Sequence, residues 1–229
     1  MMANLPNADS DPVNGAAPVT GAFRDTVQRL GLLTTVRNLR GAFRGDVGRW
    51  VRDGCPSPAP NVVKMAIVRA FVRKFRTRVF IETGTFLGSM LEYIAAEEVE
   101  CHSVEIDKTL FERAKRMLGR HKNVELHLGD SAVVLPRLLA RLDRPATFWL
   151  DGHYSGGFTS RSDVDTPVSA ELEHILAHPI RRHVILIDDA RDFTGDDGYP
   201  RLSTLLAHFE THPYYRAEIS ADIIRITPR

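Results

Sequence analysis

The sequence has little of what marks secreted, membrane-spanning or cysteine-based metal proteins. It contains only two cysteines, Cys55 and Cys101, without Cys-x-x-Cys spacing, which argues against a cysteine zinc or redox site and against a structural disulfide. No apolar run approaches the roughly 20 residues that a membrane-spanning helix needs. The first residues lack the basic-then-apolar order of a signal peptide. We therefore expect a cytoplasmic protein with no transmembrane segment.

Charge is unevenly distributed along the chain. Residues 1–80 contain 13 Lys and Arg against 5 Asp and Glu, and the remainder contains 17 against 24, although the net charge is only +1. A basic segment can bind a membrane surface or nucleic acid. We favour the interpretation that it docks on the acidic remainder of the chain or on a partner subunit, and we expect no nucleic-acid partner.

The first 60 residues differ in composition from the rest. Residues 1–20 are rich in Asn, Asp, Pro, Gly and Ala and lack apolar periodicity, which predicts a disordered arm. Residues 21–60 are predicted to form a basic helical extension and a linker. Their apolar side chains recur at steps of three and four, as in an amphipathic helix: Val36, Leu39, Phe43, Val47 and Trp50. Gly41, Gly45 and Gly48 interrupt this pattern and predict short, broken helices. The segment "CPSPAPN" is typical of a stiff linker.

A regular pattern begins at residue 61. Asn61 can cap a helix, and Val63, Ile67, Ala70 and Phe71 make one apolar face of it. From residue 78, short β-type runs alternate with helical patterns: RVFIET, CHSVEI, VELHLG, ATFWLD and HVILID. This alternation predicts a parallel sheet with helices on both faces.

The last segment, YYRAEISADIIRIT, is typical of two strands with almost no connection, which must pair antiparallel as a hairpin. The sequence shows no internal repeats. The predicted fold is therefore α/β: a doubly wound, mostly parallel, seven-stranded Rossmann-like sheet with an antiparallel C-terminal hairpin and additional N-terminal helices.

Ligands of open α/β sheets bind beyond the carboxyl ends of the strands. The first such turn, FIETGTFLGSM, has Gly84 and Gly88 four residues apart, which is not the Gly-x-Gly-x-x-Gly of a dinucleotide site. Glycine lets a ligand approach the backbone, and the carboxylate of Glu82 would repel a phosphate but accept hydrogen bonds from an ammonium group. This chemistry suits an amino-acid moiety.

The next two turns carry further acids. Glu105, after the second strand, is placed to accept hydrogen bonds from vicinal ribose hydroxyls. Asp107 is predicted to cap the following helix. After the third strand, Asp130 or Ser131 could meet an adenine amino group or cap a turn. Pro136 predicts that the regular helix begins there.

These motifs, IETGTFLG, VEID and GDS, resemble the first three motifs of class I S-adenosylmethionine-dependent methyltransferases. The resemblance spans residues 79–227, and it implies a methyltransferase domain over residues 61–229. It also implies that S-adenosylmethionine would bind to one set of residues: Glu82, Gly84, Thr85, Gly88, Glu105, Asp130 and Ser131.

Three carboxylates follow the fourth and fifth predicted strands. Asp151 ends the fourth, and Asp188 and Asp189 end the fifth. On adjacent parallel strands these side chains would meet, and their mutual repulsion would favour a bound cation. An all-oxygen ligand set suits Mg²⁺.

The arrangement is similar to metal-dependent O-methyltransferases of two kinds, the catechol type and the macrocin and mycinamicin type. That resemblance implies Asp151, Asp188 and Asp189 as Mg²⁺ ligands. The macrolide enzymes have Asp-Gly-Asp where this chain has Asp151, Gly152 and His153, and the lysine base of the catechol enzymes has no counterpart in this loop. His153 could be the general base, a metal ligand or a strand cap. The segment of residues 152–165 is too long for an ordinary connection between a strand and a helix, and it is predicted to form a lid.

We therefore predict an S-adenosylmethionine-dependent O-methyltransferase, assisted by Mg²⁺, that methylates a hydroxyl of a sugar or polyol-like acceptor such as a glycoside. Asp151 and His153 are its candidate catalytic residues. Two alternatives are a non-catalytic S-adenosylmethionine-binding module and a metal-dependent hydrolase. The basic N-terminal segment is compatible with a homodimer.

Overall fold

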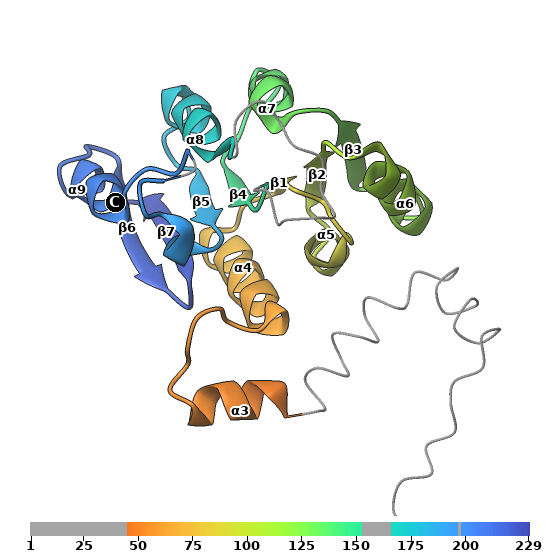
Figure 1. Ribbon diagram of the computed structural model, residues 1–229. Coiled ribbons are helices and arrows are strands. Elements are labelled where there is room, and N and C mark those ends of the chain that lie inside the picture. The colour runs from red at the N-terminus through yellow and green to blue at the C-terminus, as the bar shows by residue number, and fades with distance from the viewer. Residues whose placement is uncertain (1–44, 153–165, 197) are drawn as a thin grey trace, which may run out of the picture.

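Seven strands form one sheet in the order β3-β2-β1-β4-β5-β7-β6 in a computed structural model that describes residues 45–152, 166–196 and 198–229 (Figure 1). The strands are β1 (Val79–Thr83), β2 (Glu100–Glu105), β3 (Val124–Leu128), β4 (Ala146–Leu150), β5 (Val184–Ile187), β6 (Tyr215–Ser220) and β7 (Ile223–Pro228). Strands β1 to β5 pair in parallel, and β7 pairs antiparallel with both β5 and β6. The predicted fold class, including the C-terminal hairpin, is confirmed.

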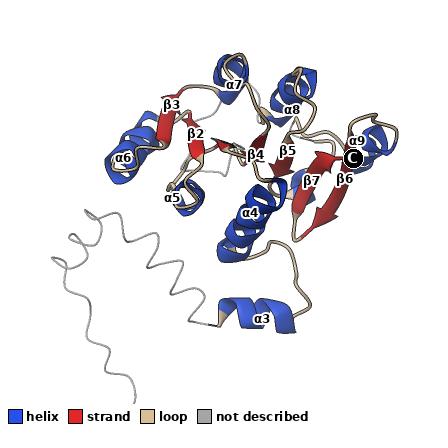
Figure 2. Ribbon diagram, turned by 180° about the vertical axis from the view of Figure 1, so that it is seen from behind, coloured by secondary structure: helices blue, strands red, loops and turns tan. Residues whose placement is uncertain are grey.

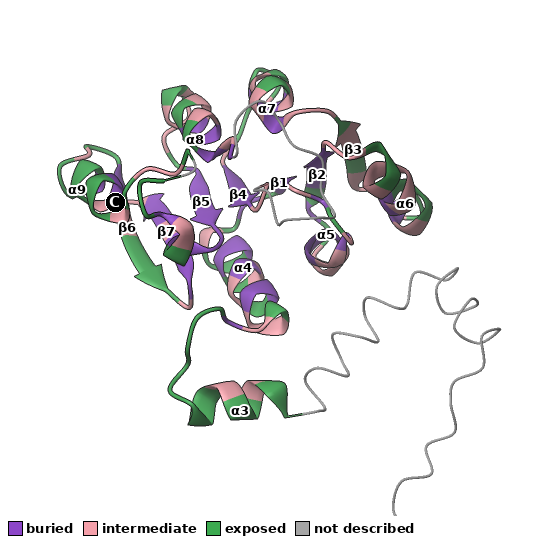
Figure 3. Cartoon of the chain, in the orientation of Figure 1, coloured by how far each residue is buried: buried purple, intermediate pink, exposed green. Residues whose placement is uncertain are grey.

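Helices cover both faces of the sheet (Figures 1 and 2). The helical elements are α3 (Asp46–Arg52), α4 (Asn61–Phe75), α5 (Ser89–Ala95), α6 (Lys108–Leu118), α7 (Ser131–Leu139), α8 (Val168–Ala177), the 3₁₀ turn η1 (Ala190–Asp192) and α9 (Leu202–Glu210). Helices α4, α5 and α6 pack against one face, and α7, α8 and α9 pack against the other, so that the sheet separates two hydrophobic clusters. Strands β1, β4 and β5 are buried along their whole length (Figure 3), as expected for parallel strands covered on both sides.

Side-chain caps fix two helix starts next to strand ends. Asp107 accepts hydrogen bonds from the backbone N–H groups of Thr109 and Leu110 and caps α6, as predicted. Asp130 accepts one from Ala132 and caps α7. The predicted start of this helix at Pro136 is wrong, because the Asp130 cap starts it at Ser131 and leaves Pro136 inside the helix.

The predicted apolar face of α4 is only partly correct, because Phe71 is buried as predicted but the other three residues are not. Ala70 is exposed, and Val63 and Ile67 are only partly buried. The face that packs on the sheet is rotated, and it consists of Lys64, Met65, Val68, Phe71 and Val72. The buried stripe includes a lysine, so a search for apolar residues alone does not find it. Asn61 is the first residue of α4, and Pro60 holds the N-cap position.

The N-terminal part of the described chain stands apart from the sheet. Helix α3 has no buried residue, and Figure 1 shows it separated from the sheet by α4 and the linker. The predicted arm of residues 1–20 and the extension up to residue 44 lie outside the described residues. Within the described ranges, no helix is both long and apolar enough to cross a membrane.

Candidate active site

Three aspartates meet where β4 and β5 end. Asp151 directly follows β4, and Asp188 and Asp189 directly follow β5, its parallel neighbour. One carboxylate oxygen from each lies within 4.8 Å of the others. Backbone hydrogen bonds continue past the strand ends and hold the first two, since Asp151 N–H donates to Thr83 O and Asp188 N–H donates to Leu150 O, each at 3.0 Å. The structure therefore brings together the three acids that the sequence placed in one site.

A buried lysine from α4 contacts two of these acids. Lys64 Nζ lies 2.6 Å from Asp188 Oδ1 and 2.9 Å from Asp189 Oδ1, and Lys64 is only 8% exposed. The sequence prediction missed this residue. The signal that could have found it is the spacing of Lys64 with Val68 and Phe71, which puts a charge on an otherwise apolar helix face.

Asp189 is held from a second side by Arg191. The Arg191 guanidinium lies 2.7 Å from Asp189 Oδ1 and also contacts the carboxylate of Asp222, a buried residue at the turn between β6 and β7. Asp189 itself adopts a left-handed backbone with φ 51°, a conformation that aspartate tolerates better than most residues. Sequence reasoning found neither Arg191 nor Asp222.

The electrostatics of this cluster match a cation site. Burial raises the pKa of Asp188, and the neighbouring Asp189 raises it further, whereas Lys64 lowers it. Three carboxylates against one ammonium and one guanidinium leave an excess of negative charge. Carboxylate oxygens are the donors that a hard divalent cation such as Mg²⁺ prefers, and the Lys64 ammonium lies against two of the three acids.

A second group of polar residues lies at the ends of β1 and β2. Glu82 is 2% exposed and accepts a hydrogen bond of 2.6 Å from the Ser103 hydroxyl, which is 2.7 Å from the Thr85 hydroxyl. Burial raises the pKa of Glu82 well above its usual range, the Ser103 hydrogen bond opposes this, and the charges of Asp151 and Glu105 add to the increase. No ion pair in the described part of the chain involves Glu82. A ligand ammonium beside it would favour the ionised form.

The two glycines of the first turn have positive φ angles and close neighbours. Gly84 has φ +86°, and a Cβ there would lie 2.3 Å from the carbonyl oxygen of Asp151. Gly88, at the N-cap of α5, has φ +70°, and its Cβ would lie 3.0 Å from Leu118 Cδ1. Gly84 thus lets the β1 turn lie directly against the backbone of the acid cluster.

Glu105 is fixed by the backbone. Its two carboxylate oxygens accept hydrogen bonds from the N–H groups of Phe86, at 2.8 Å, and Asp107, at 2.9 Å. Each oxygen keeps a further lone pair, so the carboxylate is oriented and still able to accept from a ligand hydroxyl. Phe86, which the sequence prediction did not single out, is 48% exposed in the same turn.

Asp130 and Ser131 lie at the start of α7, after β3. Asp130 Oδ1 accepts from Ala132 N–H at 2.8 Å, which makes it a helix cap, and Ser131 is buried. Of the two interpretations given for Asp130, the cap is therefore the one visible here.

The remaining candidate, His153, and the predicted lid from residue 153 to residue 165 lie outside the described residues. Next to the acids, Tyr199 lines a small cavity together with Gly152 and Asp188. Burial raises the pKa of Tyr199 to about 12, so its hydroxyl is protonated at neutral pH.

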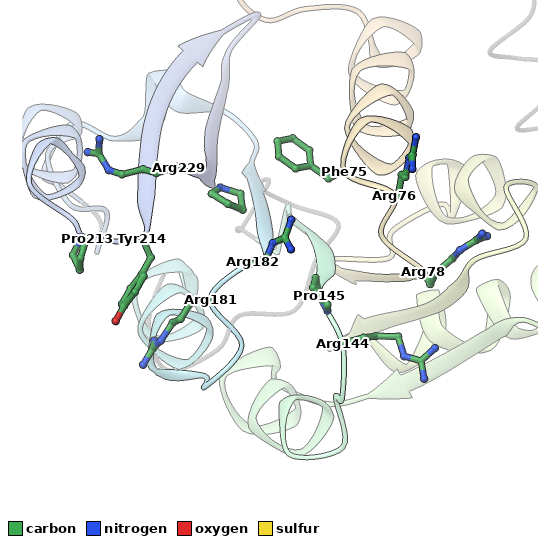
Figure 4. Close-up of a pocket in the computed structure, with 11 residues that line it drawn as sticks. Phe75, Arg76, Arg78, Arg144, Pro145, Arg181, Arg182, Pro213, Tyr214 and Arg229 are labelled. Atoms are coloured by element: carbon green, nitrogen blue, oxygen red, sulfur yellow. The ribbon is translucent and has the colours of Figure 1, made fainter.

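A larger, basic cavity lies at the opposite end of the strands (Figure 4). It has a volume of about 600 Å³ and is lined by six arginines, Arg76, Arg78, Arg144, Arg181, Arg182 and Arg229. These residues lie around the N-terminal ends of the parallel strands. Because each of the strands β1 and β4 is about 16 Å long, this cavity is distinct from the site at the strand ends.

Comparison with known proteins identifies the fold. No protein-family model and no curated protein matches the sequence. Among solved structures, the O-methyltransferase TomG from Streptomyces achromogenes, involved in tomaymycin synthesis and in complex with SAM, is 14% identical, with a TM-score of 0.55 over 80% of this chain and 86% of that chain.

Two further structures are similar over nearly their whole length. An O-methyltransferase from Bacillus cereus in complex with SAH is 13% identical, with a TM-score of 0.57 over 91% of this chain and 97% of that chain. A methyltransferase from Geobacter sulfurreducens is 15% identical, with a TM-score of 0.54 over 93% of this chain and 99% of that chain. The chain therefore has the fold of these methyltransferases.

Proposed function

We propose that the chain is an S-adenosylmethionine-dependent O-methyltransferase, assisted by Mg²⁺, that methylates a hydroxyl of a sugar or polyol-like acceptor. One observation carries the proposal: Asp151, Asp188 and Asp189 converge beside the turn of Glu82 and Gly84, on a fold shared with O-methyltransferases solved with SAM or SAH. Methyl donor and acceptor would thus bind next to each other.

The cofactor would be held by the polar turns after β1, β2 and β3. Glu82 is suited to the amino group of a methionine moiety, because its buried carboxyl lacks a cationic partner among the described residues. Glu105 is suited to ribose hydroxyls, because backbone N–H groups orient its carboxylate. Gly84, Thr85, Gly88, Asp130 and Ser131 complete the proposed set. S-adenosylmethionine supplies a methyl group that is already electrophilic.

The metal would be held by Asp151, Asp188 and Asp189. Lys64 and Arg191 offset part of this negative charge, and they fix the carboxylates of Asp188 and Asp189. Mg²⁺ held by these residues would supply positive charge, which would lower the pKa of an acceptor hydroxyl.

Within the chain, we assign proton removal to His153, two residues after Asp151. An imidazole with a pKa near 6.5 is well matched to neutral pH. His153 would take the proton of the acceptor hydroxyl, and S-adenosylmethionine would supply the methyl group to that oxygen. Asp151 orients the acceptor through its carboxylate.

The acceptor class rests on the resemblance of Asp151-Gly152-His153 to the fourth-strand motif of the macrolide sugar O-methyltransferases. A vicinal pair of hydroxyls, as in a glycoside, would use the cluster of oxygen ligands best. A homodimer formed through the basic N-terminal segment stays a prediction.

Isothermal titration calorimetry tests the proposal in two separate arms. S-adenosylmethionine titrated into the full chain should bind, and Glu105→Ala should weaken this binding at least tenfold, since hydrogen bonds to a charged group are lost. Mg²⁺ titrated alone should also bind, and Asp151→Asn should weaken that binding at least tenfold while changing cofactor affinity little. Asp53→Asn, an exposed acid at the end of α3, is the charge-matched control.

The outcomes discriminate between the functions. Cofactor binding without methyl transfer to any glycoside or catechol would favour a binding module. Mg²⁺ binding with no cofactor binding in any variant would contradict the methyltransferase proposal and favour a metal-dependent hydrolase.

A further inference from the structure

A second group of potential metal ligands lies on β2 and β3, away from the three aspartates. It consists of His102 on β2 and Glu125 and His127 on β3. In the parallel pairing His102 lies opposite Glu125, and Val104 lies opposite His127. Because residues two apart in a strand share a face, the three side chains project from the same side of the sheet.

The distances between their donor atoms fit a tetrahedral zinc site. His102 Nδ1 lies 3.2 Å from His127 Nε2 and 3.5 Å from Glu125 Oε2, and His127 Nε2 lies 4.0 Å from Glu125 Oε1. Zinc bonds to nitrogen and oxygen of about 2.0–2.1 Å at tetrahedral angles place neighbouring donors about 3.4 Å apart. An ion could therefore be held with only small side-chain movements.

The outer contacts of the cluster support the same assignment. His102 Nε2 lies 3.0 Å from Glu100 Oε1, so its N–H can donate to that carboxylate. This leaves the lone pair on Nδ1, the atom that faces His127. A carboxylate on the far nitrogen is the usual support of a zinc-binding histidine.

We infer that His102, His127 and Glu125 form a binding site for Zn²⁺, with Glu100 orienting His102 and a fourth position open to water. The site is independent of the proposed methyl transfer. Its place in the fold indicates a structural role: β3 is one of the two edge strands of the sheet and is only partly buried, and a shared metal would tie it to β2. Imidazole nitrogens favour zinc over Mg²⁺, which distinguishes this site from the aspartate cluster.

Zinc binding to the full chain, measured by calorimetry in excess Mg²⁺ after chelator treatment, tests the inference. The wild type should bind one Zn²⁺ per chain, and its melting temperature should rise on binding. His127→Gln should weaken binding at least a hundredfold, and Glu100→Gln about tenfold, as expected for loss of a ligand and of its support. His174→Gln, on α8 and partly buried, is the matched control and should leave zinc affinity unchanged.

Two further measurements distinguish this site from the aspartate cluster and from cysteine-based zinc sites. Asp188→Asn should leave the high-affinity zinc site intact, and X-ray absorption of the zinc complex should show nitrogen and oxygen ligands without sulfur. Absence of zinc binding below millimolar concentration, or equal affinity in wild type and His127→Gln, would overturn the inference and leave a hydrogen bond between two imidazoles.

Discussion

Lys64 Nζ lies 2.6 Å from Asp188 Oδ1, and this buried contact joins the first helix of the domain to the end of a central strand. The same ammonium lies 2.9 Å from Asp189 Oδ1. Burial alone would lower the pKa of Lys64, but the two aspartates outweigh it and the pKa is raised. Lys64 is therefore a permanent cation at the candidate metal site.

Replacing Lys64 with methionine removes this cation and keeps the length of the side chain. We expect Lys64→Met to lower the free energy of unfolding by about 3 kcal/mol in metal-free buffer, because two buried carboxylates lose their counter-ion. Added Mg²⁺ should restore much of the loss, since it can compensate the same charges. Urea denaturation with chelator and with Mg²⁺ measures both effects. Lys74→Met, on the exposed side of the same helix, is the control, and an equal loss in both variants would contradict the prediction.

Gly84→Ala should destabilise the protein through contact with the aspartate cluster. Its Cβ would lie 2.3 Å from Asp151 O, in a backbone with φ +86°. Gly54 has a similar φ of +81° but no atom within 4 Å of its Cβ position, so Gly54→Ala isolates the cost of the backbone conformation. We expect a loss of about 1 kcal/mol for Gly54→Ala and about 3 kcal/mol or more for Gly84→Ala. If chemical denaturation gives the same loss of unfolding free energy for Gly84→Ala and Gly54→Ala, the prediction of an additional steric cost at Asp151 is contradicted.

Glu82→Gln should stabilise the ligand-free protein at alkaline pH. The pKa of Glu82 is raised well above 4.5 by burial, so the folded state binds more protons than the unfolded state above that pH. Stability from Glu82 is therefore complete below about pH 4.5 and is lost as pH rises toward the folded-state pKa. The glutamine variant should lack this decline, and under the proposed function it should also lose cofactor affinity.

The comparison of wild type and Glu82→Gln is made by unfolding at about pH 5.5 and about pH 8. Glu112→Gln, on α6, controls for the loss of one negative charge. A wild type whose stability does not fall relative to Glu82→Gln over this range would refute the prediction.

A chain of hydrogen bonds fixes which ring nitrogen of His183 carries the proton. Ala146 N–H donates to His183 Nδ1 at 3.1 Å, so this nitrogen is the acceptor. His183 Nε2 lies 2.9 Å from His178 Nδ1, and His178 Nε2 lies 3.1 Å from Leu139 O, which makes each Nε2 the donor. Burial, together with smaller electrostatic effects of His178 and Arg181, lowers the pKa of His183 to about 4.

Stability should therefore fall in mild acid. The unfolded state takes up a proton at the ordinary pKa of 6.5 and the folded state only at about 4, so the contribution of His183 is complete above pH 6.5 and is lost between these values. We expect a loss of roughly 2 kcal/mol between about pH 7.5 and about pH 5. His183→Asn retains an acceptor but cannot be protonated, and it should lose less than wild type in urea denaturation. His174→Asn should behave as wild type does.

The sequence by itself determined the order of strands and helices along the chain and the end of the sheet where the candidate site lies. The runs RVFIET, ATFWLD and HVILID are buried strands because their apolar residues are continuous, and Asp151 and Asp188 mark the ends of the last two strands. Parallel pairing then brings Asp151, Asp188 and Asp189 together without further information. Local rules suffice here, because strand burial and helix capping depend on residues only a few positions apart.

Only the tertiary structure decided which other charged or polar side chains meet. Lys64 and Asp189 are 125 positions apart, and His102 and His127 are 25 apart, so no spacing rule connects them. The face of α4 that packs on the sheet was predicted only in part for the same reason. A lysine in a buried stripe is favourable only when a carboxylate lies at its end, and that partner comes from a strand that the helix meets only in the folded chain.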